Sequence, residues 1–283
     1  MEEIKQVPYG VSDFVTVREQ NLYYVDKTMY LSLLEQQPRN LFYIRPRRFG
    51  KSLFISMMQA YYDKAMADRF DSLFGGLLIH DHPTPLRGRY QMLYLDFSQV
   101  GGDIDRISER FDEYCKVMLD GFMRKYQNEY PEAVVKAFFE IQTFSGKLAL
   151  IRDNAGALRI PLYLIIDEYD NFTNIVLNEK GEEVYHAITH ASGFYRDVFK
   201  KFKGMFERIF MTGVSPVTLD DLTSGFKIGW HLSMNPKFDK MLGFSTEDVR
   251  GMLLYYKESG MLPAESDVEA MITEMKPWYD NYC

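Results

Sequence analysis

Short apolar runs alternate with amphipathic stretches along most of this chain. The runs that read as strands are 41–45, 91–97, 162–166, 208–211 and 229–233, and the third of them is apolar throughout. Such a run is typical of a strand that is buried on both faces of a parallel sheet. Strands that alternate with helices predict an α/β fold, in which helices cover both faces of the sheet.

Helical spacing and capping residues place the predicted helices between and after the strands. They cover 29–37, 51–66, 103–127, 132–141, 145–155 and 171–204, with a loop expected near 178–181 in the last of these. Asp26 or Thr28 is the expected N-cap of the first helix, which Pro38 ends. Near the C-terminus, Ser245 is expected to cap a helix that runs to about 259, and 266–269 has the form of a capping box for a final helix.

Composition indicates a folded chain with a sizeable core. The chain has 283 residues, of which 46% are hydrophobic and 15% aromatic, enough for one large α/β domain and a small appendage. We expect residues 1–240 to form the core and 241–283 to form a small helical region that begins a lid or a linker to a further domain. The net charge of −7 argues against a general nucleic-acid binder, although residues 45–51 contain a local basic cluster.

Cysteine usage and the apolar runs bear on the cellular setting. Cys115 and Cys283 are the only cysteines, so the sequence predicts neither a disulfide framework nor a cysteine metal site. The five histidines do not suggest a metal site either. The first residues lack a signal-peptide pattern, and no apolar run approaches the roughly 20 residues that a membrane helix needs. We therefore expect a cytoplasmic protein with no membrane partner.

The first predicted strand leads into a phosphate-binding loop. The usual P-loop is Gly, four residues, then Gly-Lys-Ser/Thr, and Gly50-Lys51-Ser52 matches its end while Arg45 stands where the first Gly is usual. Gly50 would let the backbone approach a phosphate, Lys51 would supply positive charge, and Ser52 would offer a hydroxyl to Mg²⁺. We expect Pro46, in place of a glycine, to prearrange the loop. The alternative is a helix start that binds no ligand.

Polar residues also follow two other strands of the predicted sheet. Asp167-Glu168 comes after 162–166, and Thr212 comes after 208–211. Ligands of parallel sheets bind beyond the carboxyl ends of the strands, so these residues are expected beside the loop. Asp167 would hold Mg²⁺ through water, and Glu168 would be the general base that polarises the attacking water.

Several neighbouring residues leave alternatives open. Thr212 would sense the γ-phosphate, with Ser215 as the alternative sensor and a plain turn cap as the alternative role for Thr212. Asp170 is expected to serve a polar network rather than catalysis. Arg47 and Arg48 would neutralise phosphate charge or pair with acids of a neighbouring subunit, unless they are simply solvated.

Five segments in order resemble the bacterial and archaeal AAA-ATPase-like family. They are 7–14 (VPYGVSDF), 24–28 (YVDKT), 45–53 (RPRRFGKSL), 165–170 (IIDEYD) and 212–216 (TGVSP). Arg-Pro-Arg-Arg-Phe is the usual form of the loop in this family. The resemblance implies a P-loop NTPase, a three-layer α/β sandwich with strand order 5-1-4-3-2, and ATP and Mg²⁺ as ligands. The residues implied to bind the nucleotide are Arg47, Arg48, Phe49, Gly50, Lys51, Ser52 and Leu53, and, beside the adenine, Val25 and Asp26.

The resemblance also bears on function. Family members commonly continue into a restriction-endonuclease-like nuclease domain, and residues 278–282 resemble the junction, with Asn281 where Gly is usual. We expect an ATP-binding and ATP-hydrolysing regulatory domain that controls such a nuclease domain or acts on DNA through it. Turnover is expected to need a partner or a homo-oligomer, since no arginine finger stands out. The alternative is a nucleotide-gated interaction module without hydrolysis, and a small-molecule kinase would need an acceptor site that the sequence does not suggest.

Overall fold

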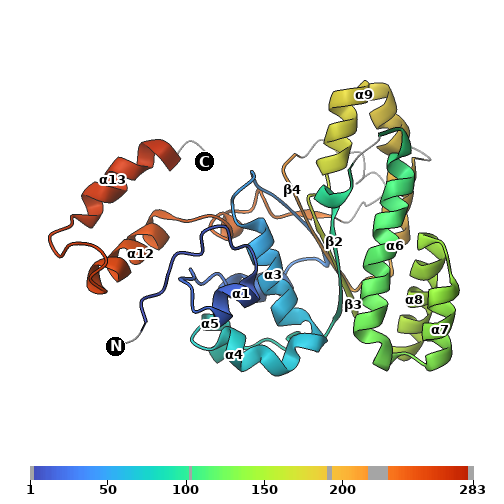
Figure 1. Ribbon diagram of the computed structural model, residues 1–283, viewed down its shortest axis with the longest axis horizontal. Coiled ribbons are helices and arrows are strands. Elements are labelled where there is room, and N and C mark those ends of the chain that lie inside the picture. The colour runs from blue at the N-terminus through green and yellow to red at the C-terminus, as the bar shows by residue number, and fades with distance from the viewer. Residues whose placement is uncertain (1–2, 102–103, 190–192, 216–228, 280–283) are drawn as a thin grey trace.

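A single parallel sheet forms the centre of the protein, and the computed structural model describes residues 3–101, 104–189, 193–215 and 229–279 (Figure 1). Its strands are β1 (Asn40–Ile44), β2 (Gln91–Asp96), β3 (Leu162–Asp167), β4 (Arg208–Gly213) and β5 (Trp230–His231). They pair in the order β2-β3-β4-β1-β5, which from the other edge reads 5-1-4-3-2 as expected. Each neighbouring pair is parallel.

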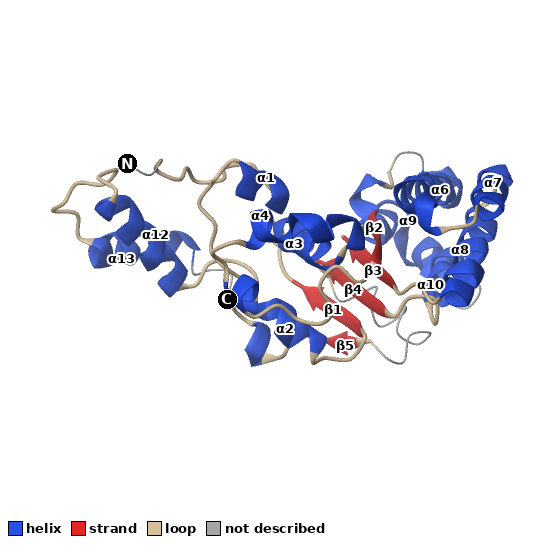
Figure 2. Ribbon diagram, turned by 90° about the horizontal axis from the view of Figure 1, so that it is seen from below, coloured by secondary structure: helices blue, strands red, loops and turns tan. Residues whose placement is uncertain are grey.

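Helices cover both faces of the sheet and complete a three-layer α/β sandwich (Figure 2). Both faces of the sheet need a cover of helices, because every residue of β3 is buried. Tyr163 and Ile165 pack into one apolar cluster, and Leu162, Leu164 and Ile166 pack into the other. The first cluster contains residues of α1 (Phe14–Glu19), α2 (Met29–Glu35), α3 (Lys51–Tyr62), α4 (Phe70–Phe74) and α5 (Leu78–Asp81). The second contains residues of α6 (Ile107–Tyr126), α7 (Glu132–Glu140), α8 (Phe144–Leu158) and α10 (Phe194–Phe202).

The strand register brings polar residues to one edge of the sheet. Asp96 at the end of β2 lies opposite Asp167 at the end of β3, and Tyr43 of β1 lies opposite Thr212 of β4. The carboxyl ends of these parallel strands therefore meet at one edge, as the pattern predicted.

Some predicted boundaries were wrong. The helix expected over 51–66 ends at Tyr62, because Asp63 has an extended backbone (ψ 123°) and its carboxylate accepts the Ala65 N–H to start a 3₁₀ turn. The first predicted helix ends at Glu35 rather than 37. The strand expected over 229–233 pairs only at Trp230 and His231.

The helix starts also differ in detail from the predictions. Helix α6 begins at Ile107 rather than 103, after a 3₁₀ turn at Ile104–Arg106. In α9 (Asn171–Thr189), Gly181 interrupts the helix with φ 80° and ψ −178°, at the end of the predicted loop. Ser245 forms its capping box with Asp248, whereas the final helix is capped by Asp267, not Ser266.

The helices α12 (Thr246–Glu258) and α13 (Val268–Tyr279) form a hairpin that extends from the core (Figure 1). Leu253, Val268 and Ile272 form its own small apolar cluster. The Lys27 ammonium lies 2.7 Å from the Asp248 carboxylate and ties the start of α12 to the core. Within the described ranges, no helix is both long enough and apolar enough to cross a membrane.

Candidate functional site

The loop between β1 and α3 shows why Arg45 can stand where P-loops usually have a glycine. Positive φ angles occur at Arg48 (68°) and Gly50 (83°), and Arg45 is not among the residues with a positive φ. The Arg45 guanidinium lies 4.6 Å from the centre of the Tyr43 ring and donates to the Ser233 carbonyl at 3.4 Å. The turn is therefore made later in the loop, and the side chain at position 45 braces its entry.

Lys51 is the first residue of α3, and its side chain turns back beneath the loop. Although it is charged, it is only 5% exposed. Its ammonium donates to the carbonyls of Arg45 (3.2 Å) and Pro46 (3.3 Å) and lies 3.2 Å from Glu168 Oε1. A buried ammonium held by oxygen atoms is preorganised to bind a phosphate oxygen that replaces one of them.

Asp167 is the centre of the polar contacts at the strand ends. Ser52 Oγ donates to its Oδ2 at 3.0 Å, Thr212 Oγ1 donates to Oδ1, and the Glu168 N–H donates to Oδ1 at 3.0 Å. Burial raises the pKa of the Asp167 carboxyl, which is 2% exposed, while the hydrogen bonds from Thr212 and Ser52 act in the opposite direction. A hydroxyl and a carboxylate this close are the hard oxygen ligands that Mg²⁺ prefers.

Glu168 adopts a backbone conformation that is uncommon for its residue type. Its φ of 52° lies in the left-handed region, where a non-glycine residue costs on the order of 1–2 kcal/mol. The turn is held on both sides, since Tyr169 N donates to the Thr212 carbonyl and Asn171 N donates to the Glu168 carbonyl, each at 3.0 Å. The result is that the Glu168 side chain reaches Lys51.

Asp170 holds the turn that follows β4. Its carboxylate accepts the Val214 N–H at 3.2 Å and the Ser215 N–H at 2.5 Å, and Asn174 Nδ2 donates to it at 3.1 Å. A Cβ on Gly213 would come within 2.6 Å of this carboxylate, so only glycine fits there. These contacts give Asp170 the polar-network role that the sequence indicated.

The other predicted nucleotide-binding residues lie around this cluster in different ways. Arg47 donates to Asn171 Oδ1 at 3.3 Å, and Arg48 is exposed. Leu53 packs against the apolar cluster on the α3 side of the sheet, and the Phe49 carbonyl accepts the Gly243 N–H at 2.9 Å.

Val25 and Asp26 belong to a separate turn. Asp26 accepts the Thr28 N–H at 2.8 Å and the Leu78 N–H at 2.7 Å, and Val25 is partly buried. The Asp26 carboxylate therefore stabilises the start of α2 and the neighbouring α5. The structure brings Lys51, Ser52, Asp167, Glu168 and Thr212 into one set of contacts, and Val25 and Asp26 are not part of it.

Sequence reasoning did not single out Asp96 or Asn171. The Asp96 carboxylate acts to raise the pKa of Asp167 from the neighbouring strand end, and Asn171 accepts the Arg47 guanidinium. The signal for Asp96 was present, since it ends an apolar strand as Asp167 does.

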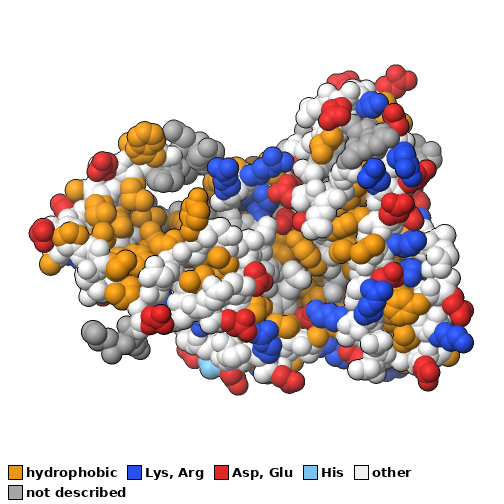
Figure 3. Space-filling view, in the orientation of Figure 1, with side chains coloured by type: hydrophobic (Ala, Val, Ile, Leu, Met, Phe, Trp, Pro, Cys, Tyr) orange, Lys and Arg blue, Asp and Glu red, His pale blue; other side chains and the backbone are white. Residues whose placement is uncertain are grey.

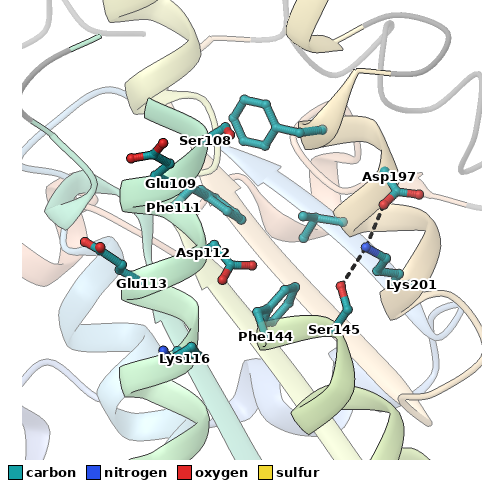
Figure 4. Close-up of a pocket in the computed structure, with 12 residues that line it drawn as sticks. Ser108, Glu109, Phe111, Asp112, Glu113, Lys116, Phe144, Ser145, Asp197 and Lys201 are labelled. Carbon is teal, nitrogen blue, oxygen red and sulfur yellow. Dashed lines mark hydrogen bonds and ion pairs between the residues drawn. The ribbon is translucent and has the colours of Figure 1, made fainter. Parts of the chain in front are cut away.

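In the space-filling view, a group of basic side chains with acidic ones next to them in projection is seen near the upper end of α3 (Figure 3). A separate hollow of about 510 Å³ lies between α6, α8 and α10 (Figure 4). There Lys201 bonds to Asp197 and Ser145, and none of the P-loop or strand-end residues lines the hollow.

Within the described residues, no group of three or more His, Cys, Asp or Glu could hold a metal ion by itself.

Comparisons with known proteins place the chain in a family. It is 27% identical over 283 residues to an "uncharacterized protein in vnfD 5'region" of Azotobacter chroococcum mcd 1, and covers 98% of its own length but only 48% of that protein. A solved structure of the Aeropyrum pernix ORC2 protein, with ADPNP and ADP, aligns with 82% of this chain and 50% of its own, at a TM-score of 0.34 and 14% identity. The family model described as "Predicted AAA-ATPase" matches residues 8–223, well over half of the chain. The chain therefore belongs to the predicted AAA-ATPase family.

Proposed function

We propose that this protein binds ATP with Mg²⁺ at the loop 45–53 and hydrolyses it, as a regulatory domain. The observation that carries the proposal is the contact set at the sheet edge, in which Lys51 meets Glu168 while Ser52 and Thr212 both bond to Asp167. The set joins the start of α3, which supplies Lys51 and Ser52, to the ends of β3 and β4. We further propose that residues 1–240 are the ATPase core and that 241–283 begin a lid or a linker.

The side chains suit distinct roles in phosphoryl transfer. Lys51 would bind the β- and γ-phosphate oxygens, because it is a buried cation at a helix start. Ser52 and Asp167 would hold Mg²⁺, which neutralises developing charge on the phosphates when bound. A single carboxylate with a hydroxyl is enough, because Mg²⁺ usually keeps several waters and substrate phosphates as ligands.

Glu168 and Thr212 would act on the attacking water and the γ-phosphate. Glu168 would accept a proton from the water, while Thr212 would hold the γ-phosphate or the water by its hydroxyl. In the structure the Glu168 carboxylate is paired with Lys51, so a phosphate that draws Lys51 away would release Glu168 for the water. This ordering makes hydrolysis follow binding.

Nucleotide binding tests the site directly. We expect Lys51→Ala to weaken Mg-ATP binding by at least about 10-fold, since a charge-assisted hydrogen bond contributes about 1.5–3 kcal/mol. The matched control is Lys64→Ala, because Lys64 is a partly exposed lysine outside the loop that pairs with Glu129 at the start of the 3₁₀ turn Lys64–Arg69. Isothermal titration calorimetry measures both variants, and equal affinity of Lys51→Ala and wild type would overturn the site.

Turnover tests the proposed base. We expect Glu168→Gln to bind Mg-ATP and to lose about 10²–10⁴-fold in hydrolysis rate, the usual contribution of a general base. Glu109→Gln is the control, because Glu109 is an exposed residue paired with Arg106. Phosphate release at saturating ATP is the readout, and an unchanged rate in Glu168→Gln would remove this residue from catalysis.

The second candidate is a nucleotide-gated interaction module without turnover. The Lys51–Glu168 pair favours this module, because the ion pair occupies Glu168, the proposed general base. Hydrolysis measured against protein concentration separates the two candidates. A rate per protein that rises with concentration supports an ATPase helped by a homo-oligomer, and a background rate at every concentration, with and without DNA, supports the module.

We also propose that the ATPase domain controls a nuclease domain in a longer protein, as the family resemblance implies. The support is that the chain spans about half the length of the Azotobacter relative. DNA cleavage by that full-length relative, measured with ATP, with ADP and without nucleotide, is the test. Cleavage that does not respond to nucleotide would contradict the proposal.

A further inference from the structure

One large exposed aromatic residue, Phe244, follows directly in the chain after a glycine that contacts the loop 45–53. Phe244 is 70% exposed, although Met241 and Leu242 just before it are buried. It lies between Gly243 and Ser245, the N-cap of α12. Neither the family motifs nor the contact set at the strand ends accounts for this ring.

The backbone before Phe244 touches the loop itself. The Gly243 N–H donates to the Phe49 carbonyl at 2.9 Å, and Phe49 immediately precedes Gly50. A Cβ on Gly243 would lie 3.2 Å from Phe49 Cδ1, and Gly243 also has a φ of 76°, so a glycine is required for this approach. Since consecutive Cα atoms are about 3.8 Å apart, Phe244 begins within roughly 10 Å of the loop glycine.

The position of Phe244 is held from the other side as well. The Ser245 capping box fixes the start of α12, and Asp248 of that box pairs with Lys27 at 2.7 Å. The side chains of Lys27 and Asp248 are only 14% and 19% exposed. Farther along α12, the rings of Tyr255 and Tyr256 lie 5.2 and 5.7 Å from the ring of Tyr23. The exposed ring is thus on a braced segment rather than on a loose loop.

We propose that Phe244 stacks on the base of the nucleotide whose phosphates the loop binds. This inference rests on the proposed function and names its base-binding residue. A nucleotide extends from its phosphates through the ribose to a flat base, and an aromatic ring beside the phosphate site can cover one face of that base. Stacking needs no hydrogen-bond pattern, so Phe244 would strengthen binding without choosing adenine over guanine.

Paired titrations with ATP and with inorganic tripolyphosphate, both with Mg²⁺, test the inference. Tripolyphosphate has the phosphates but no base. Because stacking of one base contributes about 1–3 kcal/mol, we expect Phe244→Ala to weaken ATP binding roughly 5- to 150-fold and to leave tripolyphosphate binding within about 2-fold. Phe244→Trp should restore ATP affinity. Trp278→Ala, which removes another exposed ring (77%) on α13, should change neither ligand.

The outcomes separate this inference from the proposed function. Unchanged ATP affinity in Phe244→Ala, or an equal loss for both ligands, would overturn the stacking role. Lys51→Ala should weaken both ligands, and if it weakens neither, the phosphate site itself is refuted. The unfolding midpoint of Phe244→Ala should match the wild type, since the ring is exposed.

Discussion

Replacing Asp170 by alanine should destabilise the protein strongly although this residue contacts no ligand in the proposed mechanism. Its fully buried carboxylate accepts hydrogen bonds from the N–H groups of Val214 and Ser215 and from the side chain of Asn174. The variant would leave these donors without their partner. Since Val214 and Ser215 are partly buried, water can replace only part of what is lost.

The magnitude follows from the number of donors. An unsatisfied buried donor costs about 1–3 kcal/mol, so two backbone donors and a side-chain amide give about 2–5 kcal/mol after some water access is allowed. Removal of a buried charge offsets part of this cost. With about 2–4 °C per kcal/mol for a chain of this size class, the unfolding midpoint should fall by about 4–20 °C.

The assay is thermal and urea unfolding followed by circular dichroism. Asp153→Ala is the matched control, because Asp153 is 65% exposed and pairs with the neighbouring Arg152, and it should change stability by less than about 0.5 kcal/mol. Asp170→Asn, which keeps one acceptor oxygen, should lie between the two. If Asp170→Ala is as stable as Asp153→Ala, the hydrogen bonds to the turn after β4 do not stabilise the fold and the reasoning fails.

Three further predictions concern the site and the core. Gly50→Ala should lower the free energy of unfolding by about 1 kcal/mol and weaken ATP binding, because the φ of 83° suits glycine even though a Cβ would meet no atom within 4 Å. ATP titration, with Gly156→Ala as the control, measures the loss of binding. Because burial raises the pKa of the Asp167 carboxyl, the contribution of this residue to stability is largest below the ordinary pKa and falls as pH rises through the raised one, whereas Mg²⁺-supported ATP binding should weaken on acidification. Unfolding and ATP titration of the wild type and of Asp167→Asn, from pH 7 to 4, should show both trends. Identical pH profiles for the two proteins would contradict them. Burial also raises the pKa of Cys115, so this thiol should react with a thiol reagent far more slowly in the native protein than in urea, with Cys115→Ser as the control, and equal rates would show that it is accessible.

Local pattern in the sequence was enough to predict the elements and the edge at which the site lies. A short apolar run such as 162–166 is typical of an interior strand of a parallel sheet, and the polar residues that follow such strands are expected at the edge where the strands end. One boundary error has a local cause, because the side-chain contact of Asp63 with the Ala65 N–H ends α3 earlier than helical spacing predicted. The strand order came from the family resemblance, because periodicity alone does not say which strands are neighbours.

Only the tertiary structure decided how the candidate site residues contact one another. Ser52 and Asp167 are 115 positions apart in the chain, and Phe49 meets Gly243 through a segment that no motif connects to the loop. The same holds for Arg45, whose side chain is held by Ser233, and for the Lys51–Glu168 pair. The sequence by itself determined which chemical groups the sheet edge presents, since strand periodicity and turn chemistry are local. Packing of distant segments determined their partners and their burial, and it brought Gly243, the residue before the exposed Phe244, against the loop.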